Sequence, residues 1–235
     1  MVDNYVRIAI VTGATSGIGE ATVRKFISAG FGVIGNGRNA AKLAEMEREI
    51  GPAFSGAAGD AADDTVLVNL FATASDRFGK AVDIVVANAG RGLGGSIKDA
   101  DLSQFDNLLK INVTGTLSLL QKAAQKIVAI QQNVFPKKAA DIVIIGSVVG
   151  RHISPFSAVY GATKFAVHAL AESLRREIGP KGVRVSLVEP GMVSTGFQST
   201  AGYNDEMVRS LEDRFGPLLV ADEVASAIYY IVTQP

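Results

Sequence analysis

Tyr160 and Lys164 are the residues of this sequence best suited to move a proton. They lie four positions apart in a stretch of helical periodicity, so their side chains share one helix face. A free phenol has a pKa of about 10, which a nearby ammonium lowers towards the range useful for proton transfer at neutral pH. Ser147 precedes the pair at the end of an apolar run, and its hydroxyl can donate to a substrate carbonyl or alkoxide. A tyrosine and a lysine at this spacing also occur on many solvated helices, so the interpretation depends on what accompanies them.

A glycine-rich turn near the N-terminus is suited to hold the phosphates of a dinucleotide. It reads TGATSGIGE from Thr12 to Glu20, directly after an apolar run and before a helical stretch. Glycines let such a turn approach a pyrophosphate, whose charge lies at the N-terminus of the following helix. A merely flexible turn is the alternative, and the position between strand and helix favours phosphate binding. The candidate cofactor-binding residues of the turn are Gly13, Thr15, Ser16, Gly17, Ile18 and Gly19.

The elements that must position these residues alternate between buried strands and amphipathic helices. Continuously apolar runs indicate strands buried on both faces, as in a parallel sheet covered by helices. Their alternation with helical stretches is typical of a Rossmann-type, doubly wound α/β fold. No repeat or linker divides the chain, so residues 1–235 are expected to form a single domain. Strands are expected at 6–11, 31–35, 53–57, 82–87, 141–146 and 183–188, and helices at 17–29, 40–50, 63–78, 102–132, 157–178 and 221–232.

The motifs together resemble those of the short-chain dehydrogenase/reductase family. TGATSGIG is similar to the cofactor loop of the family, Asn88-Ala89-Gly90 to its Asn-Ala-Gly, and Tyr160-Gly-Ala-Thr-Lys164 to its catalytic pair. The resemblance runs from about residue 8 to about residue 232. It implies a nicotinamide-dependent oxidoreductase that passes hydride directly between the cofactor and a carbonyl or carbinol carbon, with Tyr160 as the general acid and base.

The resemblance also implies a role for each matching position. Asn112 would complete a catalytic tetrad with Ser147, Tyr160 and Lys164, and would keep a water behind Lys164 as a proton relay. Lys164 would in addition hold the nicotinamide ribose, and Tyr160 would contact the cofactor. The remaining cofactor-binding positions would be Asp60, against the adenine, with Ala61; Asn88, Ala89 and Gly90; and Pro190, Gly191, Val193 and Thr195, with the Val193 N–H and the Thr195 hydroxyl on the carboxamide.

The end of the second expected strand favours NADP(H) over NAD(H). An NAD site usually carries an acid there that accepts from the ribose 2′-OH. This chain instead has Asn36-Gly37-Arg38, and a guanidinium can pair bidentately with a 2′-phosphate. Solvation at the start of the next helix is the alternative for Arg38. A second basic residue in the glycine turn, common in NADP-using relatives, is missing.

Composition excludes several other classes of function. The chain has no cysteine and only two histidines, so a disulfide framework, a thiolate nucleophile and a metal site are not expected. Its 23 basic residues equal its 23 acidic ones, which leaves no basic stripe for nucleic acid. No signal peptide or membrane span is evident. We expect a cytoplasmic protein that acts on a small carbonyl or alcohol substrate.

The substrate pocket is expected to form from residues after Gly90, from 149–156, and from 192–216 acting as a lid. Arg151 could hold an anionic substrate group, although solvation at the surface is favoured. His152 is expected to be a loop residue beside the pocket, and His168 to be structural. The string at 188–197 is similar to the small hydroxy-acid dehydrogenase branch of the family.

Two departures from the family pattern bear on assembly. Residues 124–140 are expected to extend a helix into a loop around Pro136, either as a solvated insertion or as a change in a subunit interface. A homo-oligomer, dimer or tetramer, is expected. Relatives usually continue past the last helix into one more strand, so either this protein lacks that strand or a C-terminal tail beyond Pro235 is missing from the sequence, and a missing tail is favoured.

Three other functions are compatible with parts of the sequence. A serine hydrolase is disfavoured because GSVVG around Ser147 lacks the Gly-x-Ser-x-Gly spacing. A non-catalytic dinucleotide-binding regulator of the same fold remains the alternative, although such relatives commonly lose the tyrosine or the lysine. An epimerase or dehydratase of the extended branch is typically longer than this chain.

Overall fold

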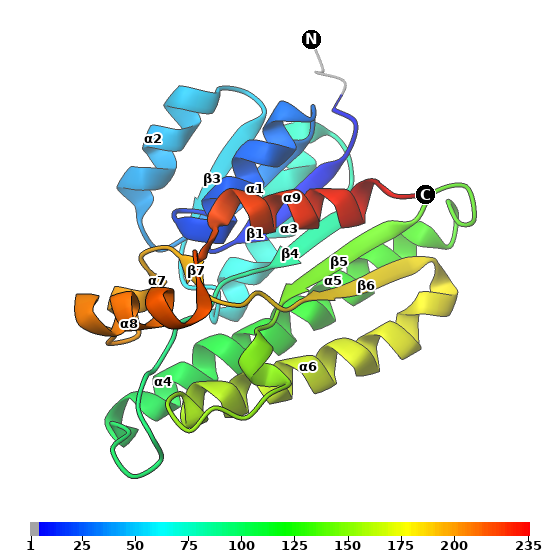
Figure 1. The fold of residues 1–235 in the computed structure, drawn as a ribbon. Helices are drawn as coiled ribbons and strands as arrows, with labels where there is room; N and C mark the ends of the chain where they lie inside the picture. Colours follow the sequence, from blue (N-terminus) through cyan, green and yellow to red (C-terminus); the bar gives the residue numbers. More distant parts are fainter. Residues whose placement is uncertain (1–4) are drawn as a thin grey trace.

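A parallel sheet with helices on both faces forms the body of the computed structural model, which describes residues 5–235 (Figure 1). Within these residues six strands follow the order β3-β2-β1-β4-β5-β6, so the strand order reverses between β1 and β4. This is the Rossmann order, with the ligand crevice at the reversal point, and it confirms the predicted fold class. The strands are β1 (Ile8–Thr12), β2 (Gly32–Gly37), β3 (Phe54–Ala58), β4 (Ile84–Ala87), β5 (Ala140–Ile145) and β6 (Val183–Val188).

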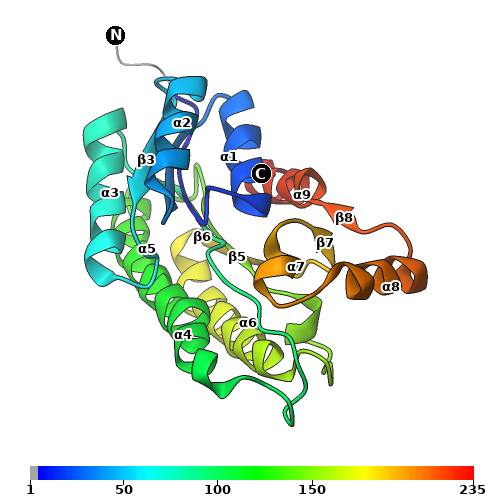
Figure 2. The same cartoon turned by 90° about the vertical axis from the view of Figure 1, so that its left-hand side faces the viewer.

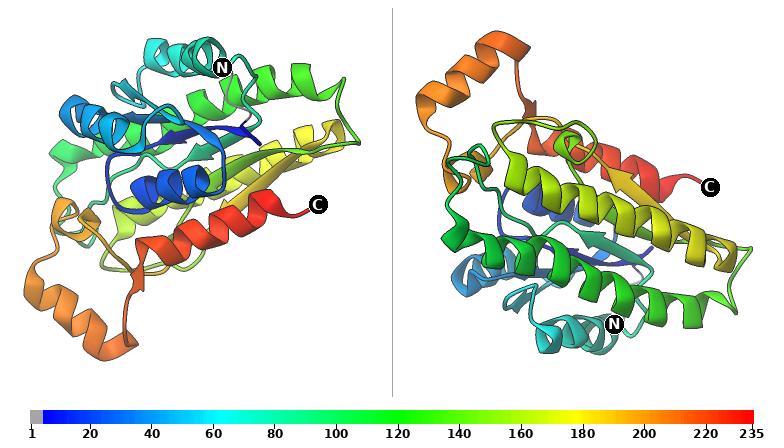
Figure 3. Two further views of the ribbon diagram at one scale, coloured as in Figure 1. Left: turned by 90° about the horizontal axis from the view of Figure 1, so that it is seen from above. Right: turned by 90° about the horizontal axis from the view of Figure 1, so that it is seen from below.

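The sheet separates two hydrophobic cores. Successive side chains of a strand point to opposite faces, and the fully buried neighbours Ile10 and Val11 accordingly belong to different cores. Figures 2 and 3 show the helices as layers on the two sides of the sheet. In the part of the chain described, no helix is long and apolar enough to cross a membrane. One core is covered by α3 (Asp64–Phe78), α5 (Thr116–Gln131) and α6 (Ala158–Ile178), and the other by α1 (Gly17–Ser28), α2 (Ala40–Ile50) and α9 (Ala221–Thr233).

The long helix expected at 102–132 is interrupted in the structure. It begins as a 3₁₀ turn (Leu102–Gln104), continues as α4 (Phe105–Leu109), and passes through a π-helical turn (Lys110–Gly115) into α5. Such π-turns are rare and concentrate at functional sites. The chain then leaves α5 through a turn around Pro136 and enters β5.

The segment after β6 stands apart from the layers. Short strands β7 (Val193–Ser194) and β8 (Leu219–Val220) pair in parallel and bracket α7 (Phe197–Thr200) and α8 (Asp205–Phe215). In Figure 2 the α7–α8 segment extends away from the sheet on the side opposite α3. The expected lid at 192–216 corresponds to this segment.

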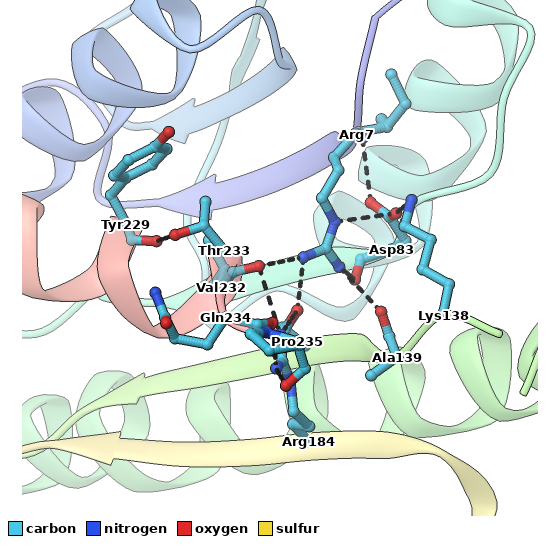
Figure 4. Close-up of polar contacts among 12 residues, drawn as sticks. Arg7, Asp83, Lys138, Ala139, Arg184, Tyr229, Val232, Thr233, Gln234 and Pro235 are labelled. Carbon is cyan, nitrogen blue, oxygen red and sulfur yellow. Dashed lines mark hydrogen bonds and ion pairs between the residues drawn. The ribbon is translucent and has the colours of Figure 1, made fainter. Parts of the chain in front are cut away.

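A buried ion cluster joins the N-terminal ends of the strands to the end of α9. The Asp141 carboxylate, 1% exposed, accepts from Arg7 Nη1 at 2.7 Å and from Arg184 Nε at 2.7 Å. Arg7 also donates to the Val232 carbonyl at 2.7 Å and pairs with Asp83 at 3.1 Å (Figure 4). Since a carboxylate between two guanidinium groups is well compensated, the cluster fixes β1, β4, β5, β6 and α9 together.

Candidate active site

The turn between β1 and α1 has the shape of a phosphate cradle. Gly13 and Gly17 have φ values of +67° and +51°, in the left-handed region that glycine adopts without strain. A Cβ at Gly19 would lie 2.1 Å from the Gly13 carbonyl oxygen, so the turn folds tightly onto the start of the helix. The Ser16 side chain makes no capping hydrogen bond, which leaves the first N–H groups of α1 without a side-chain cap. A dinucleotide pyrophosphate fits these features.

Asn88 connects the end of β4 to the glycine turn. Its Nδ2 donates to the Thr12 carbonyl at 2.9 Å and to the Gly13 carbonyl at 3.3 Å. In return, Thr12 Oγ1 accepts from the backbone N–H groups of Asn88 and Ala89, both at 3.1 Å. The Asn-Ala-Gly motif therefore lies at the reversal point of the sheet, beside the candidate phosphate cradle.

The end of β2 carries an unpaired acceptor and an exposed cation. Asn36 is completely buried; its Nδ2 donates to the carbonyls of Ala57 (3.0 Å) and Gly59 (3.2 Å), while among the described residues its Oδ1 has no partner. Arg38 is exposed, and no hydrogen bond or ion pair to it occurs within residues 5–235. Its guanidinium is therefore available to an anion.

Asp60 and Ala61 follow β3 in the turn before α3. The Asp60 Oδ1 accepts from the Ala62 N–H at 2.9 Å, which fixes the direction of the carboxylate. Ala61, with Thr12 and Ala89, lines a small cavity beside the glycine turn. Both residues thus lie on the crevice side of the sheet.

Three side chains expected to do chemistry converge where β5 meets α6. Ser147 lies two residues beyond the end of β5, as the N-cap of the 3₁₀ turn Val148–Gly150, and its hydroxyl is near enough to the phenol of Tyr160, on the first turn of α6, to lower the pKa of that phenol. Lys164, one turn further, places its Nζ 5.7 Å from the centroid of the Tyr160 ring. That Nζ donates to the Ile145 carbonyl at 2.8 Å.

Burial dominates the electrostatics of this pair. The Lys164 ammonium is 7% exposed, and its burial lowers its pKa to about 8. Burial also raises the pKa of Tyr160 above its usual value; the Ser147 hydrogen bond opposes this effect and Tyr203 adds to it. In this structure the cost of burying a phenolate opposes the lowering of the Tyr160 pKa that is expected from the ammonium.

Asn112 lies in the π-turn and clamps the loop after the Asn-Ala-Gly motif. Its Oδ1 accepts from the Arg91 N–H at 2.9 Å, and its Nδ2 donates to the Arg91 carbonyl at 2.9 Å and to Thr163 Oγ1 at 3.1 Å. A Cβ at Gly90 would lie 3.3 Å from Asn112 Oδ1 and 3.9 Å from Lys164 Nζ. The four expected tetrad residues and the Asn-Ala-Gly motif thus surround one end of the crevice.

The loop from Pro190 to Thr195 closes the crevice from the other side. The Pro190 carbonyl accepts from the Val148 N–H at 3.1 Å, which holds the loop beside Ser147. The Thr195 side chain touches the glycine turn, where a Cβ at Gly17 would lie 3.3 Å from its methyl group. Thr195 Oγ1 accepts from the Phe197 N–H at 3.2 Å, so its own hydrogen remains available to a ligand. Gly191 and Val193 lie on the same loop.

The α7–α8 segment rests on the candidate substrate side of Tyr160. The Phe197 ring lies 5.6 Å from the Tyr160 ring, and the Ala201 carbonyl accepts from the Gly94 N–H at 2.8 Å. Tyr203 is half-buried beside them, and burial raises its pKa. These aromatic side chains and the loop after Gly90 lie where the substrate pocket is expected.

Arg151 is directed to a carboxylate of the chain itself. Its Nε and Nη2 donate to the two carboxylate oxygens of Glu189 at 2.8 and 2.5 Å. The pairing raises the pKa of Arg151 and lowers that of Glu189. Arg151 was expected either to be solvated or to bind the substrate. Neither alternative included this ion pair, because Glu189 follows a different strand, β6.

Comparisons with known proteins agree with this geometry. The family model described as short chain dehydrogenase matches residues 7–206. Serine 3-dehydrogenase of Agrobacterium fabrum is 34% identical over 228 residues, 96% of this chain and 88% of that protein. An uncharacterised oxidoreductase of Staphylococcus epidermidis is 32% identical over 229 residues, 97% of this chain and 92% of that protein.

Solved structures show the same similarity. The closed form of serine dehydrogenase complexed with NADP+ superposes with a TM-score of 0.86 at 28% identity, covering 97% of this chain and 90% of that one. A 3-ketoacyl-(acyl-carrier-protein) reductase from Brucella melitensis complexed with NADH has a TM-score of 0.86 at 25% identity, covering 97% and 91%. The chain belongs to the short-chain dehydrogenase family of oxidoreductases.

Proposed function

We propose that this protein interconverts a small carbonyl compound and its alcohol with NADP(H). The observation that carries the proposal is the convergence of Ser147, Tyr160 and Lys164 at the end of a crevice whose other end is a phosphate cradle. A regulator that only binds a dinucleotide needs the cradle but not this convergence.

Each polar side chain of the site has a task in this reaction. When bound, the nicotinamide supplies or accepts the hydride. Ser147 donates to the reacting oxygen, and Tyr160, whose phenol is protonated at neutral pH, gives that oxygen a proton during reduction. Lys164 holds positive charge beneath the phenol and donates towards the cofactor ribose.

Asn112 positions these groups through the backbone of Arg91. Both hydrogens of its amide are engaged, one by the Arg91 carbonyl and one by Thr163 Oγ1. A water relay behind Lys164 would therefore rely on the backbone carbonyl of Asn112 in the π-turn more than on its side-chain amide.

Arg38 supports the preference for NADP(H). It is exposed at the end of β2, where the strand offers the amide of Asn36 and no carboxylate. A guanidinium there attracts a 2′-phosphate by charge and by paired hydrogen bonds. One similar structure is complexed with NADP+ and another with NADH, so the choice in this family depends on such local residues.

The substrate we propose is a small hydroxy acid or its oxo form. Two observations support this class: the similarity to serine 3-dehydrogenase, and the position of Phe197 and Tyr203, on the segment expected to act as a lid, next to Tyr160. Because Arg151 is paired with Glu189, we do not assign it to the substrate carboxylate.

The test for reduction follows the loss of absorbance of NADPH, and separately of NADH, on mixing with ketones, aldehydes and 3-oxo acids. The test for oxidation follows the absorbance of the NADPH formed from NADP+ with serine and other 3-hydroxy acids. We expect turnover with NADP(H), at least tenfold faster than with NAD(H), and expect Arg38→Ala to remove most of that preference. Tyr160→Phe should lose turnover but keep NADPH binding, which can be measured by the fluorescence of the reduced nicotinamide. Binding without turnover of any substrate would favour the regulator instead.

A further inference from the structure

His168 lies directly behind Ser147, on the side away from the crevice. It follows Lys164 by one turn on α6, and its Nε2 accepts a hydrogen bond from the backbone N–H of Ser147 at 3.3 Å. The side chain is 12% exposed. Because Nε2 is the acceptor, the neutral ring carries its hydrogen on Nδ1.

The backbone on both sides of Ser147 is shaped around this ring. A Cβ at Gly146 would lie 2.3 Å from His168 Nε2, and a Cβ at Gly150 would lie 2.5 Å from the same atom. Neither glycine has a positive φ. Glycine is therefore required at these two positions for space and not for backbone conformation, and the space is filled by the imidazole.

Charged groups on three elements face the ring. Glu189, at the end of β6, lies 3.9 Å from Nδ1 and is held by Arg151 from the turn after β5. Lys164 lies one turn earlier on α6. Burial lowers the pKa of His168 below its usual value, Glu189 opposes this, and Lys164 and Arg151 add to it. Beyond the ring is a cavity of about 480 Å³, whose wall also holds Glu172 and Arg175, paired with each other at 2.7 Å.

We propose that His168 is a positioning residue for Ser147: through its bond to the Ser147 N–H, it sets the direction in which the serine hydroxyl meets the reacting oxygen. The inference rests on the proposed function of Ser147. The neutral ring accepts the N–H, whereas a ring protonated on Nε2 has no lone pair to offer there. Loss of this bond lets the segment from Ser147 to Gly150 shift, and a small displacement of a donor is costly for the reaction it serves.

Two substitutions of His168 distinguish the effect of its hydrogen-bond acceptor from the effect of the volume that its ring fills. In His168→Gln the amide oxygen can reach the Nε2 position and accept at any pH, whereas His168→Met fills the space and accepts nothing. We expect His168→Met to lower kcat by about fivefold at pH 7 and to leave the NADPH Kd unchanged. A fivefold loss corresponds to roughly 1 kcal/mol, the usual contribution of one hydrogen bond. His168→Gln should keep most of the wild-type kcat. The kcat of the wild type should fall at acid pH as His168 gains a proton, and that fall should be absent in His168→Gln.

A second readout does not need turnover. The chain has two histidines, so His152→Gln leaves a single imidazole signal in NMR, that of His168. The amide shift of Ser147 should titrate with the pKa of that signal, below 6.5, and should not do so in His168→Gln.

The outcomes distinguish this inference from the proposed function. If no panel substrate is turned over by the wild type, the proposed function fails, while the amide titration still decides whether His168 holds Ser147. The inference is overturned if the amide shift of Ser147 does not follow the titration of His168. It is also overturned if the kcat of His168→Met equals that of the wild type, or if His168→Met and His168→Gln lose kcat equally. If His168→Met does not fold, His168→Gln and the titration decide alone.

Discussion

Replacing Lys164 by methionine should make the protein more stable and inactive. The ordinary pKa of lysine is 10.5 and that of buried Lys164 is about 8, which corresponds to about 3 kcal/mol spent on keeping its charge in the fold at neutral pH. Methionine fills a similar volume without charge. It loses the hydrogen bond to the Ile145 carbonyl, which offsets about 1–2 kcal/mol. The expected net gain for Lys164→Met is therefore about 1–2 kcal/mol at pH 7.

The sign of the pH dependence tests the cause. Between pH 8 and 10.5 the unfolded chain keeps the lysine proton while the folded chain releases it, so the stability of the wild type rises with pH in this window. By pH 9.5 the wild type should have gained about 2 kcal/mol that Lys164→Met cannot gain. Other groups titrate alike in both proteins and cancel in the difference.

The assay is urea unfolding of the cofactor-free proteins at pH 7 and pH 9.5, with NADPH-dependent turnover measured in parallel. Lys126, exposed on α5, gives the matched control: Lys126→Met should change stability by less than about 0.5 kcal/mol at either pH. The reasoning is refuted if Lys164→Met is less stable than the wild type at pH 7, or if the difference between them is the same at both values of pH.

Three further changes follow from the structure. Asp141→Asn should destabilise the fold by about 3 kcal/mol in urea unfolding, because it leaves buried Arg7 and partly buried Arg184 without their shared carboxylate. Glu172→Gln, at an exposed ion pair, should cost less than about 1 kcal/mol, and equal costs would contradict this. Gly19→Ala should weaken NADPH binding at least tenfold, since its Cβ would meet the Gly13 carbonyl, whereas Gly179→Ala, with open space around it, should bind as the wild type does. In absorbance titration of the cofactor-free protein, Tyr160→Phe should remove a tyrosinate signal that appears above pH 10, and loss of a signal below pH 10 would show that burial is not dominant.

The fold could be predicted closely because its strands are buried on both faces. Runs such as Ile84–Ala87 are continuously apolar, and the strand at 183–188 was placed with its observed bounds. The helix of Tyr160 and Lys164 was predicted within one residue, so their convergence followed from spacing alone. The apolar run before Ser147 predicts that this residue lies near the end of a strand, and it lies two residues beyond the end of β5.

What the sequence did not predict depends on contacts between distant residues. The π-turn at Asn112 accompanies hydrogen bonds to the Arg91 backbone, 21 positions away, and the local pattern there is that of an ordinary helix. The ion pair of Arg7 with Asp141 spans 134 positions. Spacing shows which charge is near Tyr160 and not how deeply the phenol is buried, so the sequence does not predict that burial raises the pKa of Tyr160. His168 carried one signal, its spacing of four from Lys164, which places it on the same helix face.

The two ends of the sheet bury charge in opposite ways, and the difference indicates where the chemistry is. At the N-terminal ends of the strands, Asp141 is enclosed by two guanidinium groups, so its charge is compensated and contributes to holding the layers together. At the C-terminal ends, Lys164 is also buried, yet within residues 5–235 no carboxylate forms an ion pair with it. A fold selected for stability alone would place an apolar side chain there, as Lys164→Met does. Buried charges without an ion-pair partner are found mainly at functional sites, and this supports the proposed role of Lys164 beside Tyr160.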